Sequence, residues 1–242
     1  MFSTKSTVST SEPLLTSVRL QTSSYGRPCG IVWGRSRVSG NMIWYGNFIA
    51  TPQTSITESG GKGGEMGVRQ ENTTYTYSTG LIFGLGEGPI IAVNQAYATK
   101  SKFAIGDLGF TSFLGTYSQN EWGFMLSSYP AQALKYRGES YVAVSALQLG
   151  NQTGIGNFSF EVTGHLPYDV GVIDDANMAE VVPDFLTSPY YEAGWSGALI
   201  GDLTAYSNYC RALGCSYRRC CRSSVLRQKF CKSGLISPTL SW

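Results

Sequence analysis

Residues 74–83, TYTYSTGLIF, alternate small polar residues with aromatic and apolar ones. Successive side chains of a β-strand point to opposite faces of the sheet, so a period of two predicts a strand with one buried face. Residues 158–163, FSFEVT, have the same period. Glycine, proline or asparagine interrupts the chain at the intervals that a β-barrel or β-sandwich requires. We therefore predict a mainly β fold made of half-buried strands.

The segments that precede the predicted strand 74–83 indicate a hairpin and a long connection. Gly40-Asn41 directly precedes the apolar run 42–49, which is typical of a tight turn between two strands. Such a turn would place Trp33 and Trp44 on adjacent strands. Residues 50–72 consist largely of Ser, Thr, Gly, Glu and Lys and predict a long loop or an extended arm. Long loops in compact domains usually carry a function or an interface.

Two helices are predicted after the β body. Asp174-Asp175 would cap the first, which Pro183 would bend, and Asp202 would cap the second, which Gly214 would end. The apolar positions at helical spacing are Met178, Val181, Val182, Phe185 and Leu186 in the first helix, and Leu203, Tyr206, Cys210 and Leu213 in the second. The chain is thereby divided into a flexible arm (1–13), a β body (14–165), a small helical segment (166–214) and a basic tail (215–242).

The composition favours extensive contact with other proteins. Charged residues make up only 14% of the 242 residues, whereas about 25% is usual in soluble domains. Hydroxyl and amide groups must cover much of the surface, and these cost less to desolvate than charges. The alternative is a secreted or viral β protein with an uncharged polar surface. Because no apolar run of 18 residues and no secretory signal stand out, we expect no membrane span and no export by that route.

The end of the chain differs from the rest. Residues 1–202 hold all 16 acidic residues and 11 of the 18 basic ones, which gives −5, whereas the remaining residues carry +7 and five of the six cysteines. The cysteine spacing matches no zinc site. A basic tail can bind nucleic acid through phosphate contacts. A sudden gain of Arg, Cys and Ser with the loss of all acids is also what an out-of-frame segment produces. We favour that second interpretation and expect no nucleic-acid partner.

The motifs that approach a catalytic or nucleotide site are each incomplete. Gly60-Gly61-Lys62-Gly63-Gly64 lacks the hydroxyl residue that follows the lysine of a phosphate-binding loop, which leaves a mobile glycine hinge as the better interpretation. Gly84, Gly86 and Gly88 run into Pro89, with no helix pattern after them. Gly194-Trp195-Ser196-Gly197-Ala198 ends in alanine where a nucleophile elbow needs glycine.

His165 is the only histidine, so any mechanism that needs imidazole would have to use it. Its position between Gly164 and Pro167, at the expected domain boundary, favours a structural or solvated role. We therefore predict a protein that is not an enzyme, with no catalytic residues, no bound metal and no cofactor.

Many short segments, in a fixed order, carry a resemblance to a known family. They are 20–26 (LQTSSYG), 34–37 (GRSR) with Gly40, 43–44 (IW), 61–63 (GKG), 75–78 (YTYS), 86–90 (GEGPI), 114–119 (LGTYSQ), 133–138 (ALKYRG), 141–142 (YV), 157–162 (NFSFEV), 175–177 (DAN) with Val181, 184–187 (DFLT) and 206–214 (YSNYCRALG). In this order they resemble the tail tip or baseplate hub family of long-tailed bacteriophages and gene transfer agents. The resemblance covers about residues 14–214.

The resemblance implies a hub of β-barrel domains, arranged as a trimer, that closes the tail tube. The implied partners are the distal tail ring and the end of the tape measure, and the implied location is the virion tail tip, after assembly in the cytoplasm of the bacterial host. Family members are usually much longer and continue their pattern past Gly214, so the chain resembles a truncated member. The implied particle is that of a phage, a prophage or a gene transfer agent.

The residues to which we assign an assembly or structural role are Tyr25, Gly26, Pro28, Gly34, Arg35, Gly40, Trp44, Gly61, Lys62, Gly63, Glu87, Gly88 and Pro89. Among them, Lys62 and its flanking glycines are expected at a subunit contact.

Two other functions are compatible with the sequence. Trp33, Trp44, Trp122 and many tyrosines would suit a carbohydrate-binding β module, because aromatic faces stack on sugars, although we favour packing in a core or interface as their explanation. A hydrolase would need His165 beside a nucleophile in a pocket.

Overall fold

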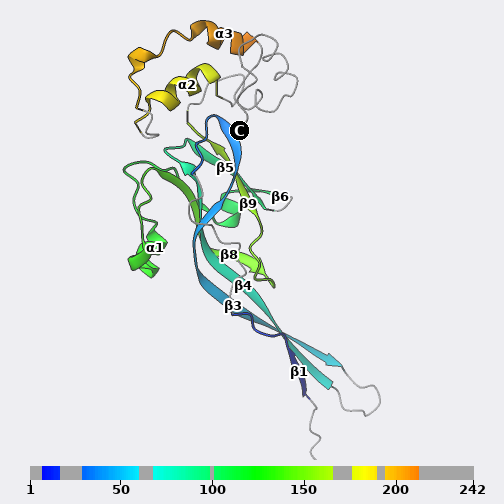
Figure 1. The fold of residues 1–242 in the computed structure, drawn as a ribbon. Helices are drawn as coiled ribbons and strands as arrows, with labels where there is room; N and C mark the ends of the chain where they lie inside the picture. Colours follow the sequence, from blue (N-terminus) through cyan, green and yellow to red (C-terminus); the bar gives the residue numbers. More distant parts are fainter. Residues whose placement is uncertain are drawn as a thin grey trace, which may run out of the picture.

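The computed structural model describes residues 7–16, 29–59, 68–98, 101–165, 176–189 and 194–212. These residues form two β-sheets, followed along the chain by a small helical segment (Figure 1). The predicted mainly β fold is thus confirmed.

The larger sheet is built around one long strand, β4 (Val68–Glu87). The strand β3 (Asn41–Ser59) pairs with it in antiparallel orientation along almost its whole length. On its other side, β4 pairs first with the parallel strand β1 (Thr7–Ser11) and then with the antiparallel strand β8 (Glu139–Gly150). The short strand β7 (Thr111–Phe113) extends the sheet beyond β8.

The smaller sheet has the strand order β2 (Arg35–Ser39), β9 (Phe158–Thr163), β5 (Ala92–Ala98) and β6 (Ser101–Ala104). All its neighbouring strands are antiparallel. Within the described residues its strands do not pair with those of the larger sheet, so the two sheets form a sandwich and the barrel alternative is wrong.

The main core lies between the two sheets. Leu81 and Phe83 of β4 pack with Phe160 and Val162 of β9, and none of these four side chains is more than 3% exposed. The rings of Phe83 and Phe160 are 5.7 Å apart. Burying one such side chain contributes about 1.5–3 kcal/mol, so this cluster accounts for the association of the sheets. The predicted period of two in residues 158–163 is confirmed.

A second cluster covers the opposite face of the larger sheet. Ile82, Tyr141 and Ala143 pack there against Trp122 and Met125. Met125 belongs to the helix α1 (Gly123–Ser128), which the 3-10 turn η2 (Pro130–Gln132) follows. The inner part of β4 is therefore buried on both faces, so the prediction of a half-buried strand is wrong for that part.

The hairpin predicted at Gly40-Asn41 does not form. The strand before Gly40 belongs to the smaller sheet and the strand after it belongs to the larger one. A Cβ at Gly40 would lie 2.8 Å from Cε2 of Phe160 and 3.1 Å from Cδ1 of Phe83, so glycine is needed there for close packing between the sheets. Trp33 and Trp44 consequently lie in different parts of the fold: Trp33 bridges to His165, and Trp44 is on β3.

The long loop predicted for residues 50–72 is also not found. Residues 50–59 and 68–72 belong to β3 and β4 and pair from Ala50↔Tyr77 to Ser59↔Val68. The low apolar content of residues 50–72 is the reason that the sequence predicts a loop. The β-branched residues Thr and Ile nevertheless fit a strand whose side chains are exposed. The alternative of an extended arm describes this segment.

The helical segment contains α2 (Met178–Thr187), the 3-10 turn η3 (Gly197–Leu199) and α3 (Thr204–Ala212). The predicted cap Asp202 is confirmed, because its carboxylate accepts a hydrogen bond of 2.8 Å from the Thr204 amide. The described cap of α2 is Asn177, whose Oδ1 accepts from the Ala179 amide at 3.0 Å, whereas Asp174 and Asp175 lie outside the described residues. Pro183 lies inside α2, as predicted.

Candidate assembly surfaces

The feature that stands out in the fold is a projecting arm, which consists of β1, residues 49–59 of β3 and residues 68–78 of β4. In Figure 1 it extends away from the body of the two sheets. All described side chains of residues 51–58 are exposed, and so are the apolar side chains of Val8 (50%), Ile49 (46%) and Ile56 (51%). A sheet of three strands needs a packed hydrophobic face for independent stability. Among the described residues, no hydrophobic core cluster includes a side chain of the outer arm.

The two faces of the arm differ in chemistry. Cross-strand partners point to the same face of a sheet, so the register defines each face. One of them, the uncharged face, combines hydroxyl and amide side chains with two aliphatic ones: Val8, Thr10, Ile49, Thr51, Gln53, Ser55, Thr57, Gln70, Asn72, Thr74, Thr76 and Ser78. The opposite face carries Pro52, Ile56, Tyr75 and the ion pair between Arg69 and Glu71 (3.0 Å).

The arm is held firmly where it joins the body. Tyr77 is only 3% exposed, and its ring stacks on that of Phe48, with the ring centroids 5.5 Å apart. Its hydroxyl accepts a hydrogen bond of 3.1 Å from the Leu15 amide, which fixes the N-terminal segment against β4. The buried Thr79 hydroxyl donates to the Gly46 carbonyl at 3.0 Å. These contacts fasten β3, β4 and the N-terminal segment to one another at the base of the arm.

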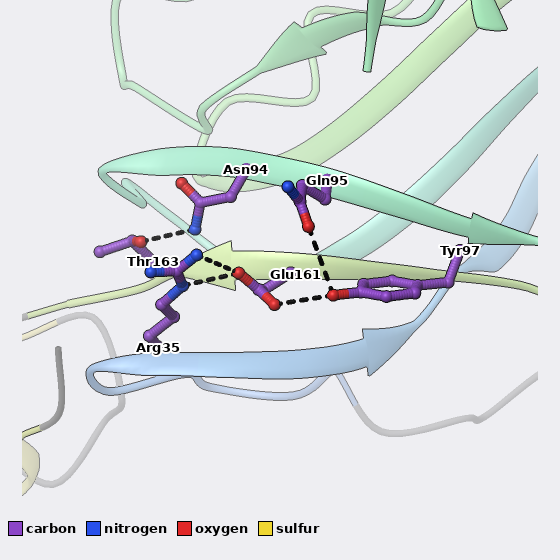
Figure 2. A network of polar contacts seen from close by, with 6 residues as sticks. All are labelled: Arg35, Asn94, Gln95, Tyr97, Glu161 and Thr163. Atoms are coloured by element: carbon purple, nitrogen blue, oxygen red, sulfur yellow. Dashed lines mark hydrogen bonds and ion pairs between the residues drawn. The ribbon is translucent and has the colours of Figure 1, made fainter. Parts of the chain in front are cut away.

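A second candidate surface is the outward face of the smaller sheet, which we call the Arg–Tyr face: Arg35, Arg37, Tyr97, Lys102 and Glu161. The register places all five on the side of the sheet opposite Phe160 and Val162. Figure 2 shows Glu161 between Arg35 and Tyr97. Arg35 Nε donates to Glu161 Oε1 at 2.6 Å, and the Tyr97 hydroxyl donates to Glu161 Oε2 at 2.9 Å.

The rest of this face continues the same network. The Arg37 guanidinium lies 4.0 Å from the centre of the Tyr97 ring, and its Nε donates to the Ser159 hydroxyl at 2.7 Å. Asn94 Nδ2 donates to Thr163 Oγ1 at 2.8 Å, as Figure 2 shows. The polar side chains of this face are therefore fixed by one another.

These contacts change two pKa values. Burial opposes ionisation of Glu161, but the hydrogen bonds from Arg35 and Tyr97, together with the charge of Arg35, outweigh it and lower the pKa of Glu161. The hydrogen bond to Glu161 raises the pKa of Tyr97. Glu161 is thus held as the carboxylate and Tyr97 as the neutral phenol.

The predicted motif Glu87-Gly88-Pro89 forms a close-packed junction. The Glu87 amide donates to the Gly30 carbonyl at 2.9 Å, and the Gly88 amide donates to the Gly138 carbonyl at 2.7 Å. Burial raises the pKa of the Glu87 carboxyl, and the charge of Glu139, its partner across the strands, adds to the effect. This region joins the N-terminal segment, β4 and β8.

The structure does not bring the predicted assembly residues together. Gly34 directly precedes the strand β2, which Arg35 begins, Gly40 lies between the sheets, and Glu87, Gly88 and Pro89 lie at the junction. Tyr25, Gly26, Pro28, Gly61, Lys62 and Gly63 lie outside the described residues, as do residues 213–242, which include the predicted tail. The assembly role of these residues stays a prediction.

Of the Arg–Tyr face, only Arg35 is among the predicted assembly residues, so sequence reasoning missed four of its residues as site candidates: Arg37, Tyr97, Lys102 and Glu161. The strand period in residues 158–163 already placed Glu161 on the side opposite the apolar residues, but nothing in the sequence paired that strand with residues 35–39.

The tryptophans considered for sugar binding are engaged within the fold. Trp33 is 8% exposed and its Nε1 donates to Asp184 Oδ2 at 2.7 Å. Trp122 is 9% exposed, and Trp44 Nε1 donates to Gln132 Oε1 at 2.7 Å. These rings pack in the interior or against a neighbouring turn, as the core alternative requires.

His165 belongs to the junction between the sheets. Its ring Nε2 lies 3.3 Å from the Glu87 carbonyl, and its amide donates to the Val32 carbonyl at 2.7 Å. Among the described residues, no group of three or more His, Cys, Asp and Glu is placed to hold a metal ion. No helix in the described part of the chain is long and apolar enough to cross a bilayer.

Comparison with known proteins gives one similarity of fold. No protein-family model matches the chain, and no curated protein matches it. Among solved structures, it is similar to a chain of a structure described as the virion of a native gene transfer agent particle, with a TM-score of 0.41 and 23% identity. The match covers 84% of this chain and 44% of that one, so the chain spans less than half the length of the chain it matches.

Proposed function

We propose that the chain is a structural subunit of a phage-like particle, positioned at the tail tip or baseplate hub, and not an enzyme. The observation that carries the proposal is the projecting arm, a sheet that continues two strands of a packed sandwich and whose side chains, in the described part of the chain, belong to no hydrophobic core cluster. A rigid sheet of this kind suits a part that is completed by contact with a neighbour.

The chemistry of the arm supports this function. Its uncharged face consists mainly of hydroxyl and amide groups, which lose less free energy on desolvation than charged groups do. Val8 and Ile49 add apolar area to the same face. The face can therefore be buried against another protein without leaving charges unpaired.

The resemblance of the ordered sequence segments supports the more specific assignment. It implies a trimeric hub that closes the tail tube and contacts the distal tail ring and the end of the tape measure. In this proposal the arm makes one of those contacts, and the protein resides in the virion after assembly in the bacterial cytoplasm.

The test is to remove the arm and measure incorporation into particles. Residues 54–73 would be replaced by Asn-Gly, because the flanking residues Gln53 and Thr74 are cross-strand partners and a two-residue turn can join them. We expect a folded chain, with its melting temperature within a few degrees of the full-length value, that is lost from purified particles. A control carries Leu126→Asp, which changes an exposed apolar residue of the body. Normal incorporation of the shortened chain would contradict the proposal.

A further inference from the structure

The Arg–Tyr face carries positive charge that the described residues do not balance. Arg35, Arg37 and Lys102 share it with one carboxylate, Glu161, which is already paired with Arg35. The Nη groups of Arg37 have no hydrogen-bond acceptor, and Lys102 has no carboxylate within ion-pair distance, among the described residues. Two cations are thus left without a counter-charge.

These cations are held by strands and not by a mobile loop. Lys102 lies across from Tyr97 in the register of β5 and β6, and its charge acts on Glu161. Arg37 is fixed between the Tyr97 ring and the Ser159 hydroxyl. Fixing a long side chain before binding removes part of the entropy cost of association. Tyrosine and arginine are also the residues that dominate the energy of protein interfaces.

We propose that the Arg–Tyr face is a second docking surface, whose partner is an acidic protein surface that places carboxylates against Arg37 and Lys102. This inference rests on the proposed assembly function in one respect: it takes the acidic partner to be a neighbouring subunit. Charge complementarity selects carboxylates. A nucleic acid fits less well, because phosphate binding uses a row of cations, and Glu161 would repel the phosphates.

The experiment titrates the full chain with a peptide of eight glutamates, blocked at both termini, and follows the Arg Nε–Hε resonances by NMR. Duplex DNA is titrated in parallel. We expect the Arg37 resonance to shift with the peptide at about 50 mM salt and the shift to vanish at about 500 mM, where screening is strong. Lys102→Gln should weaken peptide binding about twofold to fivefold, and the double variant Arg37→Gln/Lys102→Gln roughly tenfold.

The matched control is Lys135→Gln. Lys135 is also an exposed lysine, but it lies away from this face and pairs with Glu121 at 3.7 Å. The Lys135→Gln variant should leave peptide binding unchanged. An absent shift, an equal or larger shift with DNA, or equal effects of the Lys102 and Lys135 substitutions would each overturn the proposal. Because the titration uses the isolated chain, its failure is distinguishable from failure of the proposed function, which is read from incorporation into particles.

Discussion

Gly88 lies where two backbone segments pass too closely for a side chain. A Cβ at this position would lie 2.7 Å from Gly115 Cα and 2.8 Å from the Leu114 carbonyl oxygen, and neither is a flexible side-chain end. Gly88→Ala should therefore lower the free energy of unfolding by about 1–3 kcal/mol. Urea denaturation at neutral pH measures the change.

The control for this substitution is Gly123→Ala at the first turn of α1, where a Cβ would have no neighbour within 4 Å. It should leave stability unchanged or raise it by up to about 1 kcal/mol, because alanine has less freedom in the unfolded chain. Similar losses for both variants would show that the close approach at Gly88 does not determine its identity.

Glu161 should make the stability of the fold depend on pH. Its pKa is lowered in the folded protein, so its contribution is present above the ordinary value of 4.5 and is lost as the pH falls through the lower folded value. Glu161→Gln should cost about 1–3 kcal/mol at pH 7. The difference from the unsubstituted chain should shrink below pH 4.5. Urea denaturation at several pH values tests this, and a difference that is constant with pH would contradict it.

At the scale of the element, β4 changes character along its length. The described side chains of its outer part are exposed or half-buried, whereas its inner part is buried on both faces, with Phe83 in one cluster and Ile82 in the other. Ile82→Ala should therefore cost about 2–5 kcal/mol, as Phe83→Ala does. Ile56→Ala, on the exposed ladder of β3, should change stability by less than about 0.5 kcal/mol. Thermal and urea denaturation compare the three, and a tolerant position 82 would show that the second cluster contributes little.

The strands themselves could be predicted from the sequence, whereas their partners could not. A period of two fixes which side chains of residues 158–163 share a face, because it depends on the local geometry of one strand. The pairing of β2 with β9 joins residues 120 to 128 positions apart, and no local signal encodes it. Gly40 was read as a turn because a glycine required by packing and a glycine required by a turn look the same in a sequence.

The helix caps show the same limit of sequence-based prediction: a local signal can be predicted, whereas a tertiary contact cannot. Asp202 was predicted correctly because it directly precedes the apolar stripe of its helix. For α2 the described cap is Asn177, a few residues after the acidic pair that seemed the stronger signal. Asn177 Nδ2 also donates to the Ser207 hydroxyl of α3 at 3.0 Å, so its second role depends on tertiary contact.

At the scale of the whole molecule, stability is concentrated in the sandwich. Leu81, Phe83, Phe160 and Val162 lie between the sheets, whereas the described side chains of residues 51–58 are exposed and belong to no core cluster. The body can therefore fold without the arm, and the arm is available for another chain. A gradient of backbone stability along β4 follows from this division, since exposed ladders open at lower free energy than buried ones.

Hydrogen exchange measures that gradient directly. In the isolated chain, amides of residues 69–74 in β4 should exchange at least about a hundredfold faster than those of Leu81, Ile82 and Phe83 in the same strand. In assembled particles the arm amides should become protected while those of the body barely change, because the arm then lies against a neighbour. The inner amides serve as the internal control. Equal protection along β4 in the isolated chain would mean that the arm is stable by itself. Unchanged exchange of the arm amides in particles would mean that no neighbour covers it.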